Sequence, residues 1–161
     1  MDIREKHMYA APIDEVWKRQ TDAEYQKEKL TAIGNSNVEV KECGPSGDGF
    51  KLVIGMDVTA DLPGFAAKVL PKTTHITQTY VWANTSGDVR KGTWKAESGT
   101  PVTATGEMIL TADGETTVET INGTIKCGVP LIGGKIADFV GSSVVDGIHK
   151  DQAYTDGQLG G

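Results

Sequence analysis

From residue 36 to residue 128 the sequence has the pattern of β-strands, and no helical stretch interrupts it. The clearest strand is Phe50 to Ala60, in which apolar residues occupy every second position and give the strand one apolar face. Turn residues cluster between the strand segments, as in CGPSGDG, NTSGD, ESGTP and ADGE. Because parallel strands need a long connection, strands joined by such short turns are expected to pair antiparallel.

The same alternation predicts the other strands. They are expected at residues 37–42 and in THITQTYVWA, VRKGTWKA, PVTATGEMIL and TTVETINGTIKC. The apolar insert DLPGFAAKVLP, residues 61–71, is too short for an ordinary packed helix, and we interpret it as a lid or, alternatively, as a docking surface. The apolar positions of the later strands are Ile76, Tyr80, Trp82, Trp94, Val102, Met108, Leu110, Ile121, Ile125 and Cys127.

The residues before this region predict a first strand and two short helices. Residues 2–10 alternate loosely, and Pro12 then opens PIDEVWKRQ, whose apolar residues fall on one helical face. Thr21 and Glu24 form a capping-box pattern for a second helix, which is expected to stop at Gly34.

After Pro130 the apolar period returns to that of a helix. One long terminal helix is therefore expected, fraying into the polar tail DGQLGG, so that residues from about 155 to 161 are predicted to be flexible. The residues that cluster on its apolar side are Ile132, Ile136, Phe139, Val140 and Val144.

The stretch CGVPLIGGKIADFVG, at the start of this helix, resembles a phosphate-binding loop at first sight. A Walker A loop needs a glycine five positions before Gly134 and a Ser or Thr after Lys135. Val129 and Ile136 occupy these positions, so the stretch fails in both spacing and chemistry. We interpret its glycines as permitting a sharp turn from strand to helix.

The predicted order is one strand, two short helices, about six further strands and a long C-terminal helix. We expect one domain over residues 1–161, of the α+β class, with a curved antiparallel sheet of six to seven strands. The long helix would lie across the concave face, which is the helix-grip arrangement. Because one helix covers only part of a wide sheet, a hydrophobic space remains between them unless large side chains fill it.

Three segments resemble a known superfamily: YAAPIDEVW (9–17), GTWKAESGTPVTATGEMIL (92–110) and, above all, VPLIGGKIADFV (129–140). They are similar to START-like proteins, also called SRPBCC or polyketide-cyclase-like, whose helix-grip fold is shared with Bet v-like proteins. Within that superfamily the chain resembles the family named domain of unknown function 2505. The resemblance implies a cavity that holds lipids, polyketides or other apolar molecules, and it implies no established activity.

Two small residues on the apolar side of the terminal helix bear on this cavity. Ser143 and Gly147 lie near its centre, although an interior glycine costs a helix roughly 1 kcal/mol relative to Ala. Either the helix lies unusually close to the sheet, or small residues keep a cavity open. The residues predicted to line the cavity are Leu52, Ile54, Met56, Tyr80, Trp82, Trp94, Met108, Ile136, Val140, Ser143, Val144 and Gly147.

Candidates for acid–base chemistry all lie on predicted strands: His7, Asp57, His75, Glu107 and Glu119. The alternation turns His75 and Glu107 away from the apolar faces, and His7 is expected to be partly exposed. No Ser-His-Asp or Cys-His set follows from spacing, and no residues have metal-ligand spacing. We therefore predict no catalytic residue, no metal and no cofactor.

Composition and charge limit the binding partners and the cellular location that can be expected for this chain. The chain of 161 residues has a formal net charge of -6 and no dense Lys/Arg block, which argues against nucleic acid or an anionic membrane as its partner. It has no signal-peptide pattern and no transmembrane segment, so a cytoplasmic location is expected. Cys43 and Cys127 are expected to be unpaired thiols.

Three functions remain open at this point. The first is a binding protein for a small hydrophobic or lipid-like ligand, without strong catalysis. The second is a cyclase/aromatase-like or hydrolase-like enzyme that uses His7 or an inward tyrosine for proton transfer. The third is a protein-interaction module that docks through residues 61–71.

Overall fold

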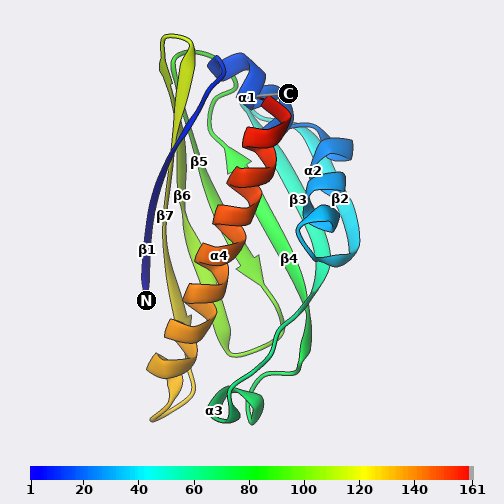
Figure 1. Cartoon of the computed structure of the whole chain (residues 1–161), viewed down its shortest axis with the longest axis vertical. Helices are drawn as coiled ribbons and strands as arrows, with labels where there is room; N and C mark the ends of the chain where they lie inside the picture. Colours follow the sequence, from blue (N-terminus) through cyan, green and yellow to red (C-terminus); the bar gives the residue numbers. More distant parts are fainter. Residues whose placement is uncertain (160–161) are drawn as a thin grey trace.

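The computed structural model describes residues 1–159, and its centre is one antiparallel sheet of seven strands in the order β1-β7-β6-β5-β4-β3-β2 (Figure 1). Successive strands from β2 to β7 are neighbours, and β1 pairs with β7. This arrangement confirms the predicted antiparallel sheet. The strands are β1 (Asp2–Tyr9), β2 (Ser36–Ser46), β3 (Gly49–Thr59), β4 (Thr73–Trp82), β5 (Val89–Glu97), β6 (Val102–Asp113) and β7 (Thr116–Cys127).

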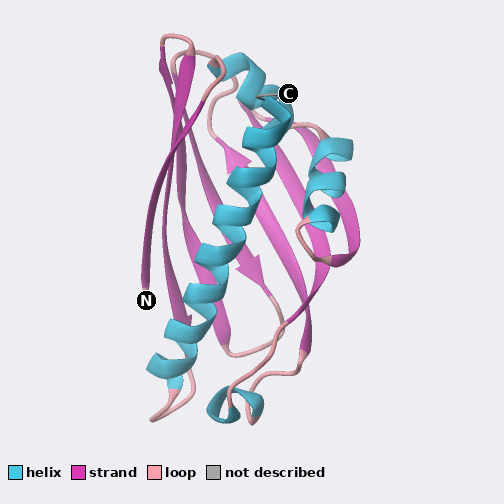
Figure 2. Cartoon of the chain, viewed as in Figure 1, coloured by secondary structure: helices cyan, strands magenta, loops and turns pink. Residues whose placement is uncertain are grey.

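One long helix crosses a face of the sheet and packs on β1 and β7, while two short helices lie beside it (Figures 1 and 2). The short insert between β3 and β4 contains a single helical turn. The helix-grip fold predicted from the sequence is thus confirmed. The helices are α1 (Ile13–Gln20), α2 (Ala23–Ala32), α3 (Gly64–Ala67) and α4 (Gly133–Leu159).

The start of α2 differs by one residue from the sequence prediction. Its N-cap is Asp22, whose side chain accepts a hydrogen bond of 3.0 Å from the backbone N–H of Tyr25. The hydroxyl of Thr21 instead donates to the carbonyl oxygen of Trp17, at the end of α1. The predicted capping box of Thr21 and Glu24 was therefore wrong, because Thr21 closes the preceding helix.

The turn between β2 and β3 is shorter than predicted. β2 continues through Pro45 to Ser46, which leaves Gly47 and Asp48 as the turn, with Gly47 at a φ of 59°. Pro45 is tolerated because β2 is an edge strand of the sheet.

The connection from β7 to α4 uses its residues differently from the sequence interpretation. The left-handed residue is Leu131, at a φ of 70°, and no glycine of this connection has a positive φ. Gly133 is required for close approach, because a Cβ there would lie 2.5 Å from the carbonyl oxygen of Cys127. Gly134 has open space around it.

The end of α4 corrects the prediction of a frayed tail. The helix continues through Leu159, and Thr155 within it is buried. Residues 155–159 are therefore an ordered part of the helix, held against α2 by a hydrogen bond of 2.9 Å between Thr155 and the Tyr25 hydroxyl. Residues 160–161 of the predicted tail lie outside the described residues.

The buried side chains form three separate apolar clusters. The first lies under α1 around Tyr9 and Val16, and the second lies between α2 and the sheet around Leu30 and Leu52. The third joins β1, β6 and β7 to α4 around Ile125. A core divided in this way leaves room between the helices and the middle of the sheet.

Candidate functional site

A cavity of about 330 Å³ lies between α4, α2 and the inner face of the sheet. Strands β3 to β7 contribute to its wall, and the insert between β3 and β4 contributes Leu62 and Leu70. Ten of the twelve residues predicted from the sequence line this cavity. They are Leu52, Met56, Tyr80, Trp82, Trp94, Met108, Val140, Ser143, Val144 and Gly147.

The other two predicted residues, Ile54 and Ile136, are fully buried and do not line the cavity. Ile54 lies on the inner face of β3, but it packs in the cluster that includes Leu30 of α2 and therefore belongs to the core. Ile136 lies in the first turns of α4, where Ala137 packs in the cluster around Ile125. Alternation and helical period predicted that both point inward, but not which element covers them.

The glycines of α4 show where this helix packs closely and where its small residues leave the cavity open. A Cβ at Gly147 would meet nothing within 4 Å, so this glycine faces open space in the cavity and permits no close packing. The close approach occurs earlier in the helix, where a Cβ at Gly141 would overlap the Met1 side chain. The helix is therefore tight against the start of the chain at Gly141 and stands away from the wall at Gly147.

Trp94 lies flat against the sheet because two neighbouring strands carry glycine beneath it. A Cβ at Gly123 would overlap the Trp94 ring, and one at Gly106 would lie 2.7 Å from its indole nitrogen. The indole N–H donates a hydrogen bond of 3.2 Å to the carbonyl oxygen of Asn122. These contacts make Trp94 a fixed part of the cavity wall.

One end of the cavity is polar, and its centre is Glu119 of β7, which is only 6% exposed. Its Oε1 accepts hydrogen bonds from the Tyr9 hydroxyl at 3.2 Å and from the Gln152 amide at 3.1 Å. Its Oε2 accepts a hydrogen bond of 3.0 Å from the Gln20 amide. Side chains from β1, α1 and α4 therefore meet on this carboxylate.

Burial makes the ionised form of Glu119 costly. Loss of hydration, followed by the negative charge of Asp151, raises the pKa of the Glu119 carboxyl, while hydrogen bonds and Lys29 oppose the rise. Burial and the neighbouring Glu119 also raise the pKa of the Tyr9 phenol, so Tyr9 is a stable hydrogen-bond donor. The polar end thus contains a carboxyl group that can change its protonation state.

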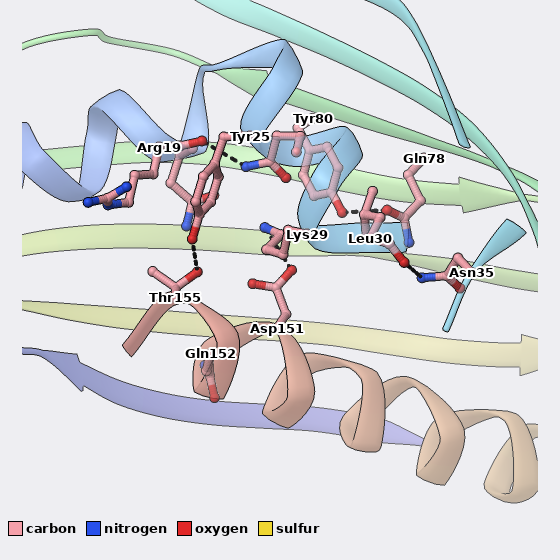
Figure 3. Close-up of polar contacts among 12 residues, drawn as sticks. Arg19, Tyr25, Lys29, Leu30, Asn35, Gln78, Tyr80, Asp151, Gln152 and Thr155 are labelled. Atoms are coloured by element: carbon pink, nitrogen blue, oxygen red, sulfur yellow. Dashed lines mark hydrogen bonds and ion pairs between the residues drawn. The ribbon is translucent and has the colours of Figure 1, made fainter. Parts of the chain in front are cut away.

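The side chains of α2 and α4 meet across the same end of the cavity (Figure 3). Lys29 is 3% exposed, and its Nζ lies 2.9 Å from Oδ2 of Asp151. Figure 3 shows these two side chains pointing at each other, with the Tyr25–Thr155 hydrogen bond one turn away. On the opposite wall Tyr80 donates a hydrogen bond of 2.7 Å to Gln78.

The other titratable candidates lie outside the cavity. The imidazole of His7 is 3.0 Å from Asp156 of α4, and His75 pairs with Asp57 at 2.8 Å with more than half of its side chain exposed. Glu107 is exposed, as predicted for the outer side of the sheet. None of these four residues lines the cavity, so the interpretation of His7 as a proton-transferring group in it was wrong.

Glu119 was a sequence candidate for acid–base chemistry but was not predicted to line the cavity, and Asp151 and Gln26 were not predicted at all, although the sequence carries a signal for all three. The alternation that turns Ile121 inward also turns Glu119 inward, since the two lie two positions apart on one strand. Asp151 follows Gly147 by four residues and therefore shares its face of α4. Gln26 similarly precedes Leu30 by four residues on α2. These residues were not assigned to the cavity because the inward faces were identified from apolar residues alone, and these three residues are polar.

Within residues 1–159 there is no group of three or more His, Cys, Asp or Glu side chains that could hold a metal ion. No helix in this part of the chain is long and apolar enough to cross a membrane. Cys43 and Cys127 are both free thiols.

Comparison with known proteins supports the fold assignment. The model of a family described as protein of unknown function (DUF2505) matches residues 4–159. A solved protein from Thermus thermophilus is 14% identical, with a TM-score of 0.67 over 99% of this chain and 97% of that one. The sequence matches none of the curated proteins with which it was compared.

Two enzymes are also similar in structure. The Zhui aromatase/cyclase from Streptomyces sp. R1128 is 17% identical, with a TM-score of 0.66 over 99% of this chain and 93% of that one. Norcoclaurine synthase from Thalictrum flavum, solved in complex with dopamine and hydroxybenzaldehyde, is 12% identical, with a TM-score of 0.58 over 96% and 86%. At these identities the likeness shows the fold alone.

Proposed function

The chain belongs to the DUF2505 family of proteins of unknown function, and we propose that it binds a small hydrophobic or lipid-like ligand in the cavity between the sheet and α4. The observation that carries the proposal is the cavity of about 330 Å³ with its mainly apolar and aromatic wall. Small-molecule sites in proteins have volumes of roughly 300–1,000 Å³ and are lined in this way. Norcoclaurine synthase, which shares the fold, is solved with two small molecules bound.

The insert at residues 61–71 supports a binding role over a docking role. Its apolar residues Leu62, Phe65 and Leu70 are only partly exposed, and Leu62 and Leu70 line the cavity. The Lys135 ammonium of α4 lies over the Phe65 ring at 5.7 Å, which holds the insert against the start of that helix. These contacts suit a lid over one end of the cavity.

Substitution of Gly147 by leucine tests the proposal directly. Since a side chain at this position meets open space in the cavity, Gly147→Leu should occupy the volume needed by an apolar ligand and weaken binding at least about tenfold. The measurement is a titration with 1-decanol that follows tryptophan fluorescence, because Trp82 and Trp94 line the cavity.

Gly157→Leu is the matched control. Gly157 also lies on α4 with open space at its Cβ, but it is exposed and does not line the cavity. This variant should bind 1-decanol as the unmodified protein does. Equal binding by both leucine variants, or no binding of 1-decanol to the unmodified protein, would contradict the proposal.

A further inference from the structure

With both of its carboxyl groups ionised, the polar end of the cavity contains more negative than positive charge. Two carboxylates, Glu119 and Asp151, line it, and Lys29 is the ammonium that faces them. Lys29 lies at ion-pair distance from Asp151, so its charge is already matched by a carboxylate. Glu119 is thus left without a counter-ion of its own among residues 1–159.

The groups that contact Glu119 from each neighbouring element are neutral hydrogen-bond donors. They are the phenol of Tyr9 on β1 and the amides of Gln20 on α1 and Gln152 on α4. A carboxylate oxygen can accept two hydrogen bonds. Among the described residues Oε1 accepts two and Oε2 accepts one, so Oε2 can accept a further donor.

The other basic side chains near this end contact groups other than Glu119. Arg19 of α1 lies over the Tyr25 ring, with 5.4 Å between its guanidinium carbon and the ring centre. Figure 3 shows the Arg19 side chain directed away from Lys29 and Asp151. His7, opposite Glu119 in the β1–β7 register, contacts Asp156. Neither side chain therefore contacts Glu119.

An unpaired carboxylate in an apolar cavity is costly, because its hydration is lost and no opposite charge replaces it. A negatively charged ligand group would add a third negative charge at this end. A positively charged donor would instead provide the missing counter-ion and the missing hydrogen bond. The charge of the site thus distinguishes between ligands whose apolar parts are the same.

The wall next to Glu119 provides a place for the apolar part of such a ligand. Ile121 follows two positions later on β7, on the same face, and it lies opposite Met108 of β6 in the strand register. Ile121 and Met108 both line the cavity, and Trp94 lies further along the same wall.

Resting on the proposed binding function, we propose that the ligand is an amphipathic amine whose protonated nitrogen donates to Glu119 while its apolar part lies over Ile121, Met108 and Trp94. Lys29 and Asp151 then complete a charge-balanced end of the cavity.

The test compares three probes that share a ten-carbon chain: decylamine, 1-decanol and decanoate. Calorimetric titration at pH 7 should show decylamine binding at least about tenfold more tightly than the other two, as expected for a hydrogen bond between charged groups. Glu119→Gln should reduce the preference for amine over alcohol to less than about threefold. Glu107→Gln removes an exposed carboxylate from the outer face of the same sheet and should keep the preference.

The outcomes separate this inference from the proposed function. Similar affinities for all three probes in the unmodified protein would overturn the inference and leave the apolar cavity as a binding site. Tighter binding of decanoate would overturn it as well and would identify Lys29 as the group that selects the ligand. Absence of binding by every probe would overturn the proposed function and, with it, the inference. If Glu119→Gln fails to fold, the affinities of the three probes for the unmodified protein still test whether the cavity prefers an amine.

Discussion

Glu119 occupies a strand position that faces the interior, where most proteins place an apolar residue. Side chains from β1, α1 and α4 surround it, and one from each of these elements donates a hydrogen bond to it. These bonds keep a buried carboxyl group in one orientation at the end of the cavity. Its cost to folding depends on whether it is ionised.

Replacement of Glu119 by glutamine should therefore change stability in a pH-dependent way. The pKa of Glu119 is raised in the folded state, so the protonated form stabilises the fold below the unfolded pKa, and this contribution is lost as pH rises through the folded pKa. As the pH rises from about 4 to 8, Glu119→Gln should gain stability relative to the unmodified protein, by on the order of 1 kcal/mol, because glutamine does not ionise.

Urea unfolding across this pH range measures the difference, with Glu107→Gln as the control for removing a carboxylate. The Gln20 amide can rotate to pair with the new amide, so the hydrogen bonds need not be lost. A stability difference between Glu119→Gln and the unmodified protein that stays constant with pH would show that Glu119 does not titrate in this way.

At the scale of elements, α2 and α4 are joined mainly through polar side chains at the end of the cavity. The Lys29–Asp151 ion pair and the Tyr25–Thr155 hydrogen bond connect them. Since Lys29 is almost completely buried, removal of Asp151 alone leaves its ammonium without water and without its ion-pair partner, and Glu119 is then the remaining carboxyl group at this end of the cavity. The pair therefore fixes the spacing of two elements that enclose the cavity.

A double-mutant cycle tests this coupling. Asp151→Asn should destabilise the protein more than the combined Lys29→Met and Asp151→Asn variant does, with a coupling energy of about 1–3 kcal/mol in urea unfolding. The exposed pair Lys95–Glu97, 3.4 Å apart on β5, is the control and should couple by less than about 1 kcal/mol. Equal coupling in the two pairs would refute a structural role for Lys29 and Asp151.

At the scale of the whole molecule, the cavity lies among three apolar clusters, and Tyr80 and Trp94, which line it, each pack against two of them. A ligand that fills it should stabilise the native state, because it binds the folded chain and not the unfolded one. The cavity therefore links thermal stability to occupancy.

This linkage predicts a thermal shift. At a free concentration of ten times its Kd, 1-decanol should stabilise the protein by about 1.4 kcal/mol, which corresponds to a Tm increase of roughly 3–6 °C for a domain of this size. Gly147→Leu should show a smaller shift at the same concentration, since its cavity is already occupied. A shift of the same size in both proteins would place the binding elsewhere.

Much of the architecture could be predicted from local patterns. Alternation located all the strands of the sheet, and the helical period located α4, because both depend on neighbours a few residues apart. The errors at the element ends arose where a side chain makes a hydrogen bond with a different element from the one that the local pattern suggested. Thr21 caps the end of α1 and not the start of α2, and contacts with α2 keep residues 155–159 helical.

The sequence by itself determined the order of the elements, the inward face of the strands from β3 to β7 and membership of a helix-grip family. Tertiary structure alone decided which inward residues pack in the core, as Ile54 and Ile136 do, and which face the cavity, as Gly147 does. It also brought Lys29, Glu119 and Asp151 together from three elements far apart in the chain. The physical reason is that periodicity describes one element at a time, whereas burial and pairing depend on the element that lies opposite.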